Sequence, residues 1–231
     1  MAFDFNTAID EDLTLTAHWK QNPTPKPEPK PEPKPEPTPA KVSGTLMAKM
    51  TAKGKTKFAI SWNKIKGAAG YDIFFAKCGK KTKKVKSIKG NKTFKWTKSG
   101  LKKGKPYITT VKAYVMKDGK KKYVSKSPYM HAYTGNATKK CTNAKSVKVK
   151  KAKVTLKKGK TFKIKAKVTK VKKNKKLMPK KHVATVRYLS TNKKVATVSK
   201  SGKIKAAGKG NCVVYAFAHN GVSKKIKVTV K

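Results

Sequence analysis

Acidic side chains are almost absent after the first forty positions of the chain. From residue 40 onward, Asp72 and Asp118 are the only two acids, whereas the same region holds 57 of the chain's 61 lysines and arginines. Catalysis by paired carboxylates needs two acids side by side, and Ca²⁺ needs several acidic oxygen ligands. We therefore expect structural roles for the two acids. Asp72 should lie on a strand, and Asp118, which precedes Gly119, should lie in a hairpin turn.

Ligands for other metals are also sparse. The four histidines include no pair spaced four residues apart and have no cysteine at ligand spacing, so the sequence predicts no metal site and no cofactor. They are His18, His131, His182 and His219. The chain also lacks a glycine-rich phosphate loop and a nucleophile elbow. We expect no enzyme within these residues; an enzyme in a preceding part of a longer protein stays open.

Cysteine is too scarce for a disulfide framework, with only Cys78, Cys141 and Cys212. We expect a buried Cys212 and an exposed Cys141, and a disulfide between these two is the open alternative. No apolar run approaches the roughly 20 residues that a membrane span requires. The opening MAFDFN does not resemble a secretory signal, and we expect the true N-terminus of the protein to lie elsewhere.

Arginine is nearly absent too, since Arg187 is the only one. Bidentate recognition of phosphates and guanine edges depends on the guanidinium group, so sequence-specific nucleic-acid binding is not expected. What the chain has instead is lysine, which gives it a formal net charge of +52 and the region from residue 40 onward about +55. A surface of one sign attracts polyanions over about a Debye length. A polyanionic partner is therefore the first prediction.

Residues 21–40 form a proline-rich linker, with proline at every second position from 23 to 39 and three copies of Lys-Pro-Glu-Pro. Proline restricts itself and its predecessor to extended geometry, which predicts a polyproline II spacer. Before it, Leu13–Trp19 alternates apolar and polar residues as a strand does. Residues 1–20 resemble the end of an internalin-type B-repeat, which implies a truncated repeat and a longer parent protein.

Residues 41–137 contain short apolar stretches divided by Gly, Lys and Asn. Strands are expected at 58–62, 71–75, 84–88, 93–96, 107–115 and 122–125. Trp62 and Tyr71 supply large aromatics for a sandwich core, and Leu101 with Tyr107 has the spacing of a tyrosine corner. The segment resembles a bacterial fibronectin type III domain, which implies a spacer or ligand-binding module without catalytic residues.

Residues 138–231 form a second all-β unit. Residues 163–168 and 225–230 alternate lysine with apolar residues, so Phe162, Ile164, Ala166 and Val168 should point inward. The stretch 188–218 resembles the bacterial immunoglobulin-like group 2 domain. Its motif positions are held by Ser190, Asn192, Val195, Ala196, Val198, Gly202, Ile204, Gly208 and Gly210.

An insertion at residues 170–181 departs from that family pattern, and we predict a mobile basic loop there. It is the best candidate for a dedicated polyanion contact. Its lysines are Lys170, Lys172, Lys173, Lys175, Lys176, Lys180 and Lys181.

The fold class expected is all-β, with two consecutive immunoglobulin-like sandwiches after the linker. The functional hypothesis is an extracellular, non-catalytic stalk of a secreted bacterial surface protein, held on anionic cell-wall polymers such as teichoic acids through lysine contacts. Open alternatives are a host- or matrix-directed adhesin, an inert spacer, and a non-specific nucleic-acid binder. The nucleic-acid alternative has little support, because the sequence shows no alternating aromatic residues on a basic groove on which bases could stack.

Overall fold

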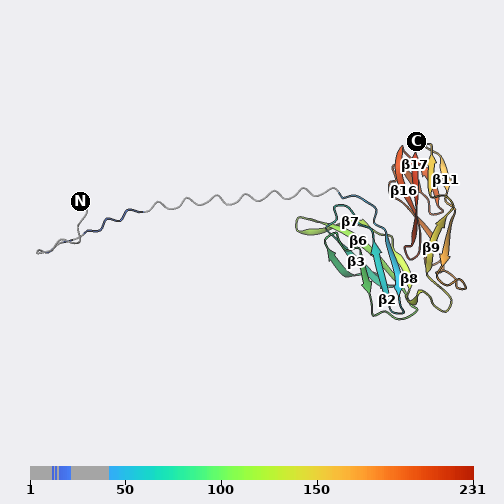
Figure 1. Cartoon of the computed structure of the whole chain (residues 1–231), viewed down its shortest axis with the longest axis horizontal. Helices are drawn as coiled ribbons and strands as arrows, with labels where there is room; N and C mark the ends of the chain where they lie inside the picture. The colour runs from blue at the N-terminus through green and yellow to red at the C-terminus, as the bar shows by residue number, and fades with distance from the viewer. Residues whose placement is uncertain (1–11, 13, 15, 22–41) are drawn as a thin grey trace. The chain divides into compact units, whose positions relative to one another are not determined.

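The computed structural model describes residues 12, 14, 16–21 and 42–231 (Figure 1). The chain divides into two units, Met1–Thr38 and Pro39–Lys231. The described residues of the first unit are exposed and form no strand, and the side chain of Trp19 is 92% exposed. The strand predicted at Leu13–Trp19 is not formed at residues 14 and 16–19, the part of it that the structure describes. The proline-rich segment 23–39 lies outside the described residues.

The first part of the second unit is a sandwich of two antiparallel sheets. A three-stranded sheet has the order β1-β2-β5, and a second sheet has the order β4-β3-β6-β7 with β8 also paired to β6. The strands are β1 (Ala48–Lys53), β2 (Lys57–Trp62), β3 (Gly70–Lys77), β4 (Lys83–Lys89), β5 (Lys95–Lys98), β6 (Pro106–Lys117), β7 (Lys120–Lys126) and β8 (Met130–Tyr133). All six strands expected here are present, and β1 and β8 were not foreseen.

The aromatic residues singled out in the sequence fill this sandwich. The ring of Tyr71 is fully buried and lies 5.5 Å from that of Trp62, centroid to centroid. Leu101 and Tyr107 are also buried, and the Tyr107 hydroxyl accepts a hydrogen bond of 3.1 Å from the backbone N–H of Lys102. The predicted tyrosine corner is thus confirmed, and it ties β6 to the turn before it.

A 3₁₀ turn, η1 (Thr134–Asn136), leads into the second sandwich. Its sheets have the orders β10-β17-β16-β13 and β11-β15-β14, with a separate pair β12-β9. The strands are β9 (Ala144–Val149), β10 (Lys153–Leu156), β11 (Thr161–Lys163), β12 (Ala166–Lys170), β13 (Val186–Ser190), β14 (Ala196–Val198), β15 (Lys203–Ala206), β16 (Gly210–Ala218) and β17 (Ser223–Val230). All pairs are antiparallel except β10 with β17.

The strand predicted at 163–168 is interrupted. β11 pairs with β15 as far as Lys163, and β12 pairs with β9 from Ala166 onward. Between them the chain moves from one sheet to the other, so a single continuous strand is impossible there. The inward face still agrees with the alternation: Ile164 is buried, and Phe162, Ala166 and Val168 pack half-buried against the core.

The two sandwiches have separate hydrophobic cores and meet through main-chain hydrogen bonds. Residues 46–132 contribute the first core and residues 144–230 the second. The N–H of Met50 in β1 donates to Asn220 O (2.8 Å), and the N–H of His131 in β8 donates to His219 O (2.7 Å). The turn after β16 therefore docks on the first sandwich. The all-β fold class is confirmed, and no helix of the described residues is long and apolar enough to cross a membrane.

Candidate polyanion-binding surface

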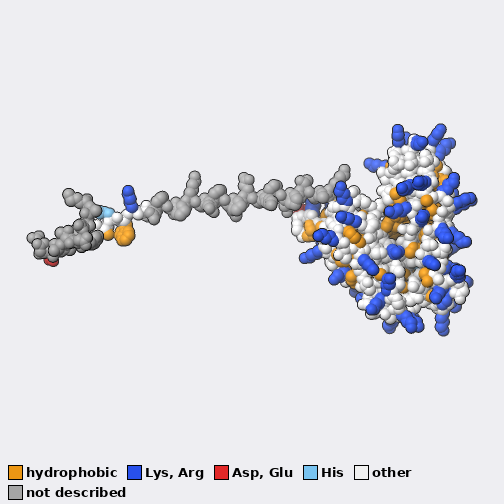
Figure 2. Space-filling model, in the orientation of Figure 1, with side chains coloured by type: hydrophobic (Ala, Val, Ile, Leu, Met, Phe, Trp, Pro, Cys, Tyr) orange, Lys and Arg blue, Asp and Glu red, His pale blue; other side chains and the backbone are white. Residues whose placement is uncertain are grey.

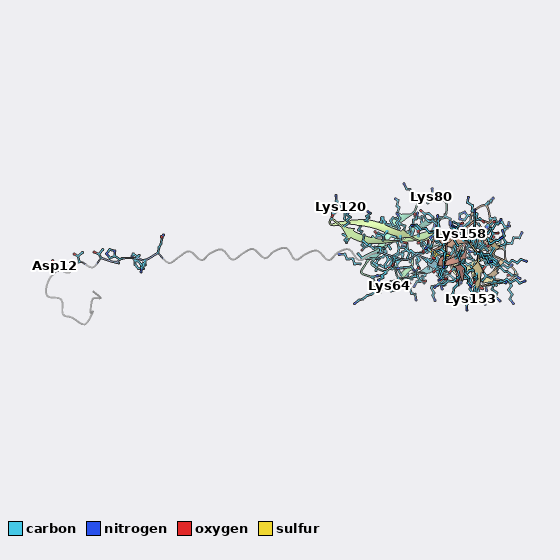
Figure 3. The ribbon with its side chains drawn as sticks, turned by 90° about the horizontal axis from the view of Figure 1, so that it is seen from above. Asp12, Lys64, Lys80, Lys120, Lys153 and Lys158 are labelled. Carbon is cyan, nitrogen blue, oxygen red and sulfur yellow. The ribbon has the colours of Figure 1, made fainter. Side chains whose placement is uncertain are left out.

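Lysines occupy the solvent-facing positions of the strands. In β17, Ile226, Val228 and Val230 are buried, whereas Lys224, Lys225 and Lys227 are exposed. The same alternation recurs across both sandwiches, and Figure 2 shows the side chains of Lys and Arg spread over the visible face of the second unit. In Figure 3 the labels of Lys64, Lys80, Lys120 and Lys153 lie at the margins of that unit. Strand alternation thus produces the positive surface.

Almost none of this charge is compensated within the protein. Among residues 42–231 the structure contains one ion pair, between Lys121 Nζ and Asp72 Oδ1 at 2.9 Å. Asp72 is fully buried and also accepts hydrogen bonds from Ser87 (2.5 Å) and Tyr123 (2.8 Å). Asp72 is therefore used for folding, and apart from Lys121 the lysines of residues 42–231 form no ion pair within that range.

The insertion at 170–181 is anchored to the second sandwich. Met178 is buried, the N–H of Thr142 donates to Lys176 O at 2.8 Å, and Lys175 Nζ donates to Thr138 O. The predicted basic loop is thus docked by its backbone and by one apolar side chain. Its exposed lysines are Lys172, Lys173, Lys176, Lys180 and Lys181, while Lys170 and Lys175 are half-buried.

Two lysine-lined hollows flank the insertion. The junction hollow, of about 760 Å³, lies where the two sandwiches join. Its basic lining residues are Lys103, Lys105, Lys139, Lys140 and Lys175. The strand hollow, of about 450 Å³, lies beside the β9-β12 pair. Its basic lining residues are Lys145, Lys148, Lys167, Lys170 and Lys173.

Sequence reasoning found part of this arrangement. Lys175 belongs to the junction hollow and Lys170 with Lys173 to the strand hollow, whereas the other insertion lysines line neither. The lysines contributed by other segments were missed. The dipeptide Lys139-Lys140 was visible in the sequence, but its proximity to Lys103 depends on how the sandwiches join.

The chemistry of these hollows suits a flexible polyanion. An ammonium group is a strongly hydrated point charge without the fixed fork of arginine, so it attracts phosphate or carboxylate without selecting a geometry. Five such groups around one open hollow can neutralise several anions of one polymer.

A cluster of three potential metal ligands lies at the junction of the sandwiches. Cys78 Sγ is 3.6 Å from His131 Nδ1, and His131 Nδ1 is 3.1 Å from His182 Nε2. The three ligand atoms all lie within 4.8 Å of one another. The three residues come from separate parts of the chain, so sequence spacing carried no signal of this cluster. All three cysteines are free thiols, Cys212 is buried and Cys141 is half-buried.

The motif residues of the second sandwich have structural roles. Val195 is buried, Val198 is half-buried, and the Ser190 hydroxyl donates to Ala196 O at 2.6 Å. Gly202 has φ +83° and lies against the ring of Tyr188; a Cβ at Gly208 would lie 2.7 Å from Lys194 O. Both glycines are required by close contacts.

Comparison with known proteins agrees with the β-sandwich fold. Residues 143–230 match the family described as the bacterial Ig-like domain (group 2). A domain of this type fits a module of a bacterial surface or stalk protein. No curated protein matches the chain.

Two similar solved structures are fibronectin type III domains. The FN5 domain of Drosophila Lar is 20% identical, with coverage of 42% of this chain and 97% of that domain and a TM-score of 0.31. The fn3 domain of human contactin 1 is 13% identical, with coverage of 44% and 86% and a TM-score of 0.34.

Proposed function

We propose that this chain is a non-catalytic stalk module of a secreted bacterial surface protein, retained outside the cell on anionic cell-wall polymers of the teichoic acid type. The observation that carries the proposal is the uncompensated lysine surface, with one ion pair among residues 42–231. Ordinary protein surfaces mix both signs of charge. A surface almost without acids is suited to a partner that supplies the negative charge itself.

The mechanism is many-point electrostatic attachment. Each lysine that neutralises a phosphate releases a condensed counterion, so affinity falls as salt rises. The junction hollow and the strand hollow add places where five lysines converge. Lysine imposes no fixed geometry, so we expect little selectivity among polyanions of similar charge density.

The test is co-sedimentation of the full chain with purified Gram-positive cell walls, with and without their teichoic acids, across a salt series. We expect binding that requires the teichoic acids. For six phosphate contacts the logarithm of the binding constant should fall with the logarithm of salt concentration with a slope of about −4. Binding that persists in molar salt, or no binding at low salt, contradicts the proposal.

Two variants that lose the same number of positive charges distinguish the contribution of the junction hollow to wall binding from that of net charge. One variant replaces the five junction-hollow lysines by glutamine: Lys103, Lys105, Lys139, Lys140 and Lys175. The control replaces five exposed lysines in and beside β4: Lys80, Lys83, Lys84, Lys86 and Lys89. A greater loss in the first variant supports the hollow as the contact site, whereas an equal loss shows that retention follows total charge alone.

The same series distinguishes the other module classes. A host- or matrix-directed adhesin would ignore purified walls and keep its binding to the host ligand at moderate salt. An inert spacer would bind neither. Equal affinity for nucleic acid and for teichoic acid would show that the lysine surface responds to charge density only.

A further inference from the structure

Three potential metal ligands converge where the two sandwiches meet. Cys78 lies in the turn directly after β3, and its N–H donates to Pro106 O at 3.1 Å. His131 lies on β8 and is 9% exposed. His182 belongs to the second sandwich, in the turn between the insertion and β13, and its N–H donates to Pro179 O at 2.9 Å. Their ligand atoms all lie within 4.8 Å of one another.

Hydrogen bonding alone satisfies this cluster incompletely. His131 Nδ1 faces both Cys78 Sγ and His182 Nε2. A ring nitrogen has a single in-plane position, which holds either one N–H or one lone pair. It therefore forms one good hydrogen bond, to Cys78 Sγ or to His182 Nε2 but not to both.

Two of the three ligand spacings are close to those around one small metal ion. Metal–sulfur bonds of about 2.3 Å and metal–nitrogen bonds of about 2.0–2.1 Å in a tetrahedral site separate the ligand atoms by roughly 3.3–3.6 Å. The observed separations are 3.6 Å between Cys78 Sγ and His131 Nδ1 and 3.1 Å between His131 Nδ1 and His182 Nε2, and the third pair, Cys78 Sγ and His182 Nε2, lies within 4.8 Å. The two imidazole rings are nearly perpendicular, with centroids 4.9 Å apart, close to the roughly 5 Å expected for two histidines on one tetrahedral ion.

We propose that Cys78, His131 and His182 bind one d¹⁰ metal ion, Cu⁺ or Zn²⁺, that links the first sandwich to the second. A thiolate with two imidazoles is the soft-to-borderline donor set that these ions prefer. The protein supplies three ligands, and water or a further ligand completes a tetrahedral Zn²⁺.

Coordination uses the thiolate of Cys78 and the neutral imidazoles of His131 and His182, so metal binding displaces the thiol proton to solvent.

The surrounding charge bears on which ion is preferred. Arg187 is a nearby cation, and the two acids after residue 40 are not among the ligands. One thiolate neutralises Cu⁺ completely but Zn²⁺ only by half. The electrostatic environment therefore favours Cu⁺ over Zn²⁺ at equal ligand affinity.

The experiment uses the tag-free full chain. Zn²⁺ is titrated against a chromophoric chelator, Cu⁺ is titrated the same way under anaerobic reducing conditions, and Co²⁺ serves as a spectroscopic probe. We expect one ion per chain and, for Co²⁺, a thiolate charge-transfer band with intense tetrahedral d–d absorption. The relative affinities of Cu⁺ and Zn²⁺ then identify the ion.

The decisive variants are His182→Gln and Cys78→Ser. His182 is exposed, so its substitution leaves the fold in place, as circular dichroism should show. Each variant should weaken binding at least about 100-fold, since loss of an outer-shell partner alone costs about 10–100-fold. The matched controls Cys141→Ser and His18→Gln should bind as the parent does.

Three results would overturn the proposal. They are no saturable binding of either ion in the micromolar range, a charge-transfer band that survives Cys78→Ser, or unchanged affinity in His182→Gln. None of these readouts involves cell-wall binding, so the metal site stands or fails independently of the proposed function.

Discussion

Asp72 shows how a chain with almost no acids uses one of them. Burial by itself raises the pKa of this carboxyl, but hydrogen bonds from Ser87, Lys121 and Tyr123 and the charge of Lys121 outweigh burial, so the pKa lies below its ordinary value of 3.8. The Lys121 ammonium lies over the ring of Tyr114 as well. At the scale of residues, one buried carboxylate therefore organises the outer face of β3, β4 and β7.

Replacement of Asp72 by Asn should destabilise the protein near neutral pH. The lowered pKa means that the ionised carboxylate stabilises the folded state above the unfolded pKa, near 3.8, and loses this contribution as pH falls through the folded pKa. We expect a loss of about 1–3 kcal/mol at pH 7, shrinking below pH 4, measured by urea unfolding at several pH values. Asp118→Asn, in the β6–β7 turn where φ is +50°, should change stability by less than about 0.5 kcal/mol.

Tyr107→Phe tests the tyrosine corner. The change removes the hydroxyl that accepts from Lys102 N–H and leaves the ring in the core. We expect a loss of about 1–2 kcal/mol in denaturant unfolding, because one hydrogen bond is lost and a backbone donor loses its partner. The control is Tyr129→Phe, whose side chain is exposed on the surface and should be nearly neutral. Equal effects in both variants would argue against the corner as a stabilising feature.

At the scale of elements, the strand pairing of the second sandwich depends on its turns and on the point where the chain passes from one sheet to another. The chain leaves the β11-β15 pairing after Lys163 and joins β9 from Ala166. The turn between β14 and β15 ends at Gly202, which combines a left-handed backbone with close packing on Tyr188. Local geometry at such points decides which strands meet.

Gly202→Ala and Gly159→Ala separate backbone strain from steric clash. Both glycines have φ +83°, but a Cβ at Gly202 would lie 2.6 Å from Tyr188 Cζ, whereas at Gly159 nothing lies within 4 Å. We expect Gly159→Ala to cost about 1–2 kcal/mol. Gly202→Ala should cost about 1–3 kcal/mol more, as measured by thermal or denaturant unfolding. Equal costs would show that the Tyr188 ring moves aside freely.

At the scale of the whole molecule, like-charge repulsion opposes folding. The chain carries a formal net charge of +52, and the described residues from 42 onward hold one ion pair. Repulsion between exposed lysines is long-ranged at low salt and is screened within about 8 Å at physiological ionic strength. The folded protein should therefore be least stable in dilute buffer.

Added salt should raise the melting temperature of the full chain. Screening of the repulsion by NaCl, from about 10 mM to about 0.5 M, should stabilise the folded state by about 1–2 kcal/mol, which corresponds to a Tm increase of about 2–8 °C. Differential scanning calorimetry checks this, with an uncharged osmolyte series as control. A Tm that falls with salt would show that specific ion pairs, not repulsion, dominate the charge effects.

Periodicity and special residues made most of the fold predictable. Alternation located β17, because one face of that strand is buried, whereas β3 and β6 were located by apolar stretches whose residues are buried on both faces over part of each strand. The spacing of Leu101 and Tyr107 predicted a corner that the structure confirms. β1 was missed although its burial alternates, because its sequence, AKMTAK, has Thr51 as its single β-branched residue and has no aromatic residue.

The sequence by itself determined the chemistry of the surface: lysine without acid from residue 40 onward, and strands that turn that lysine toward solvent. Which lysines share a hollow, and that Cys78, His131 and His182 meet at one point, only the tertiary structure decided. The physical reason is the distance along the chain over which each kind of interaction acts. Alternation and turn chemistry act over a few neighbouring residues, whereas these groups are brought together by hydrogen bonds between two sandwiches, such as that from His131 N–H to His219 O.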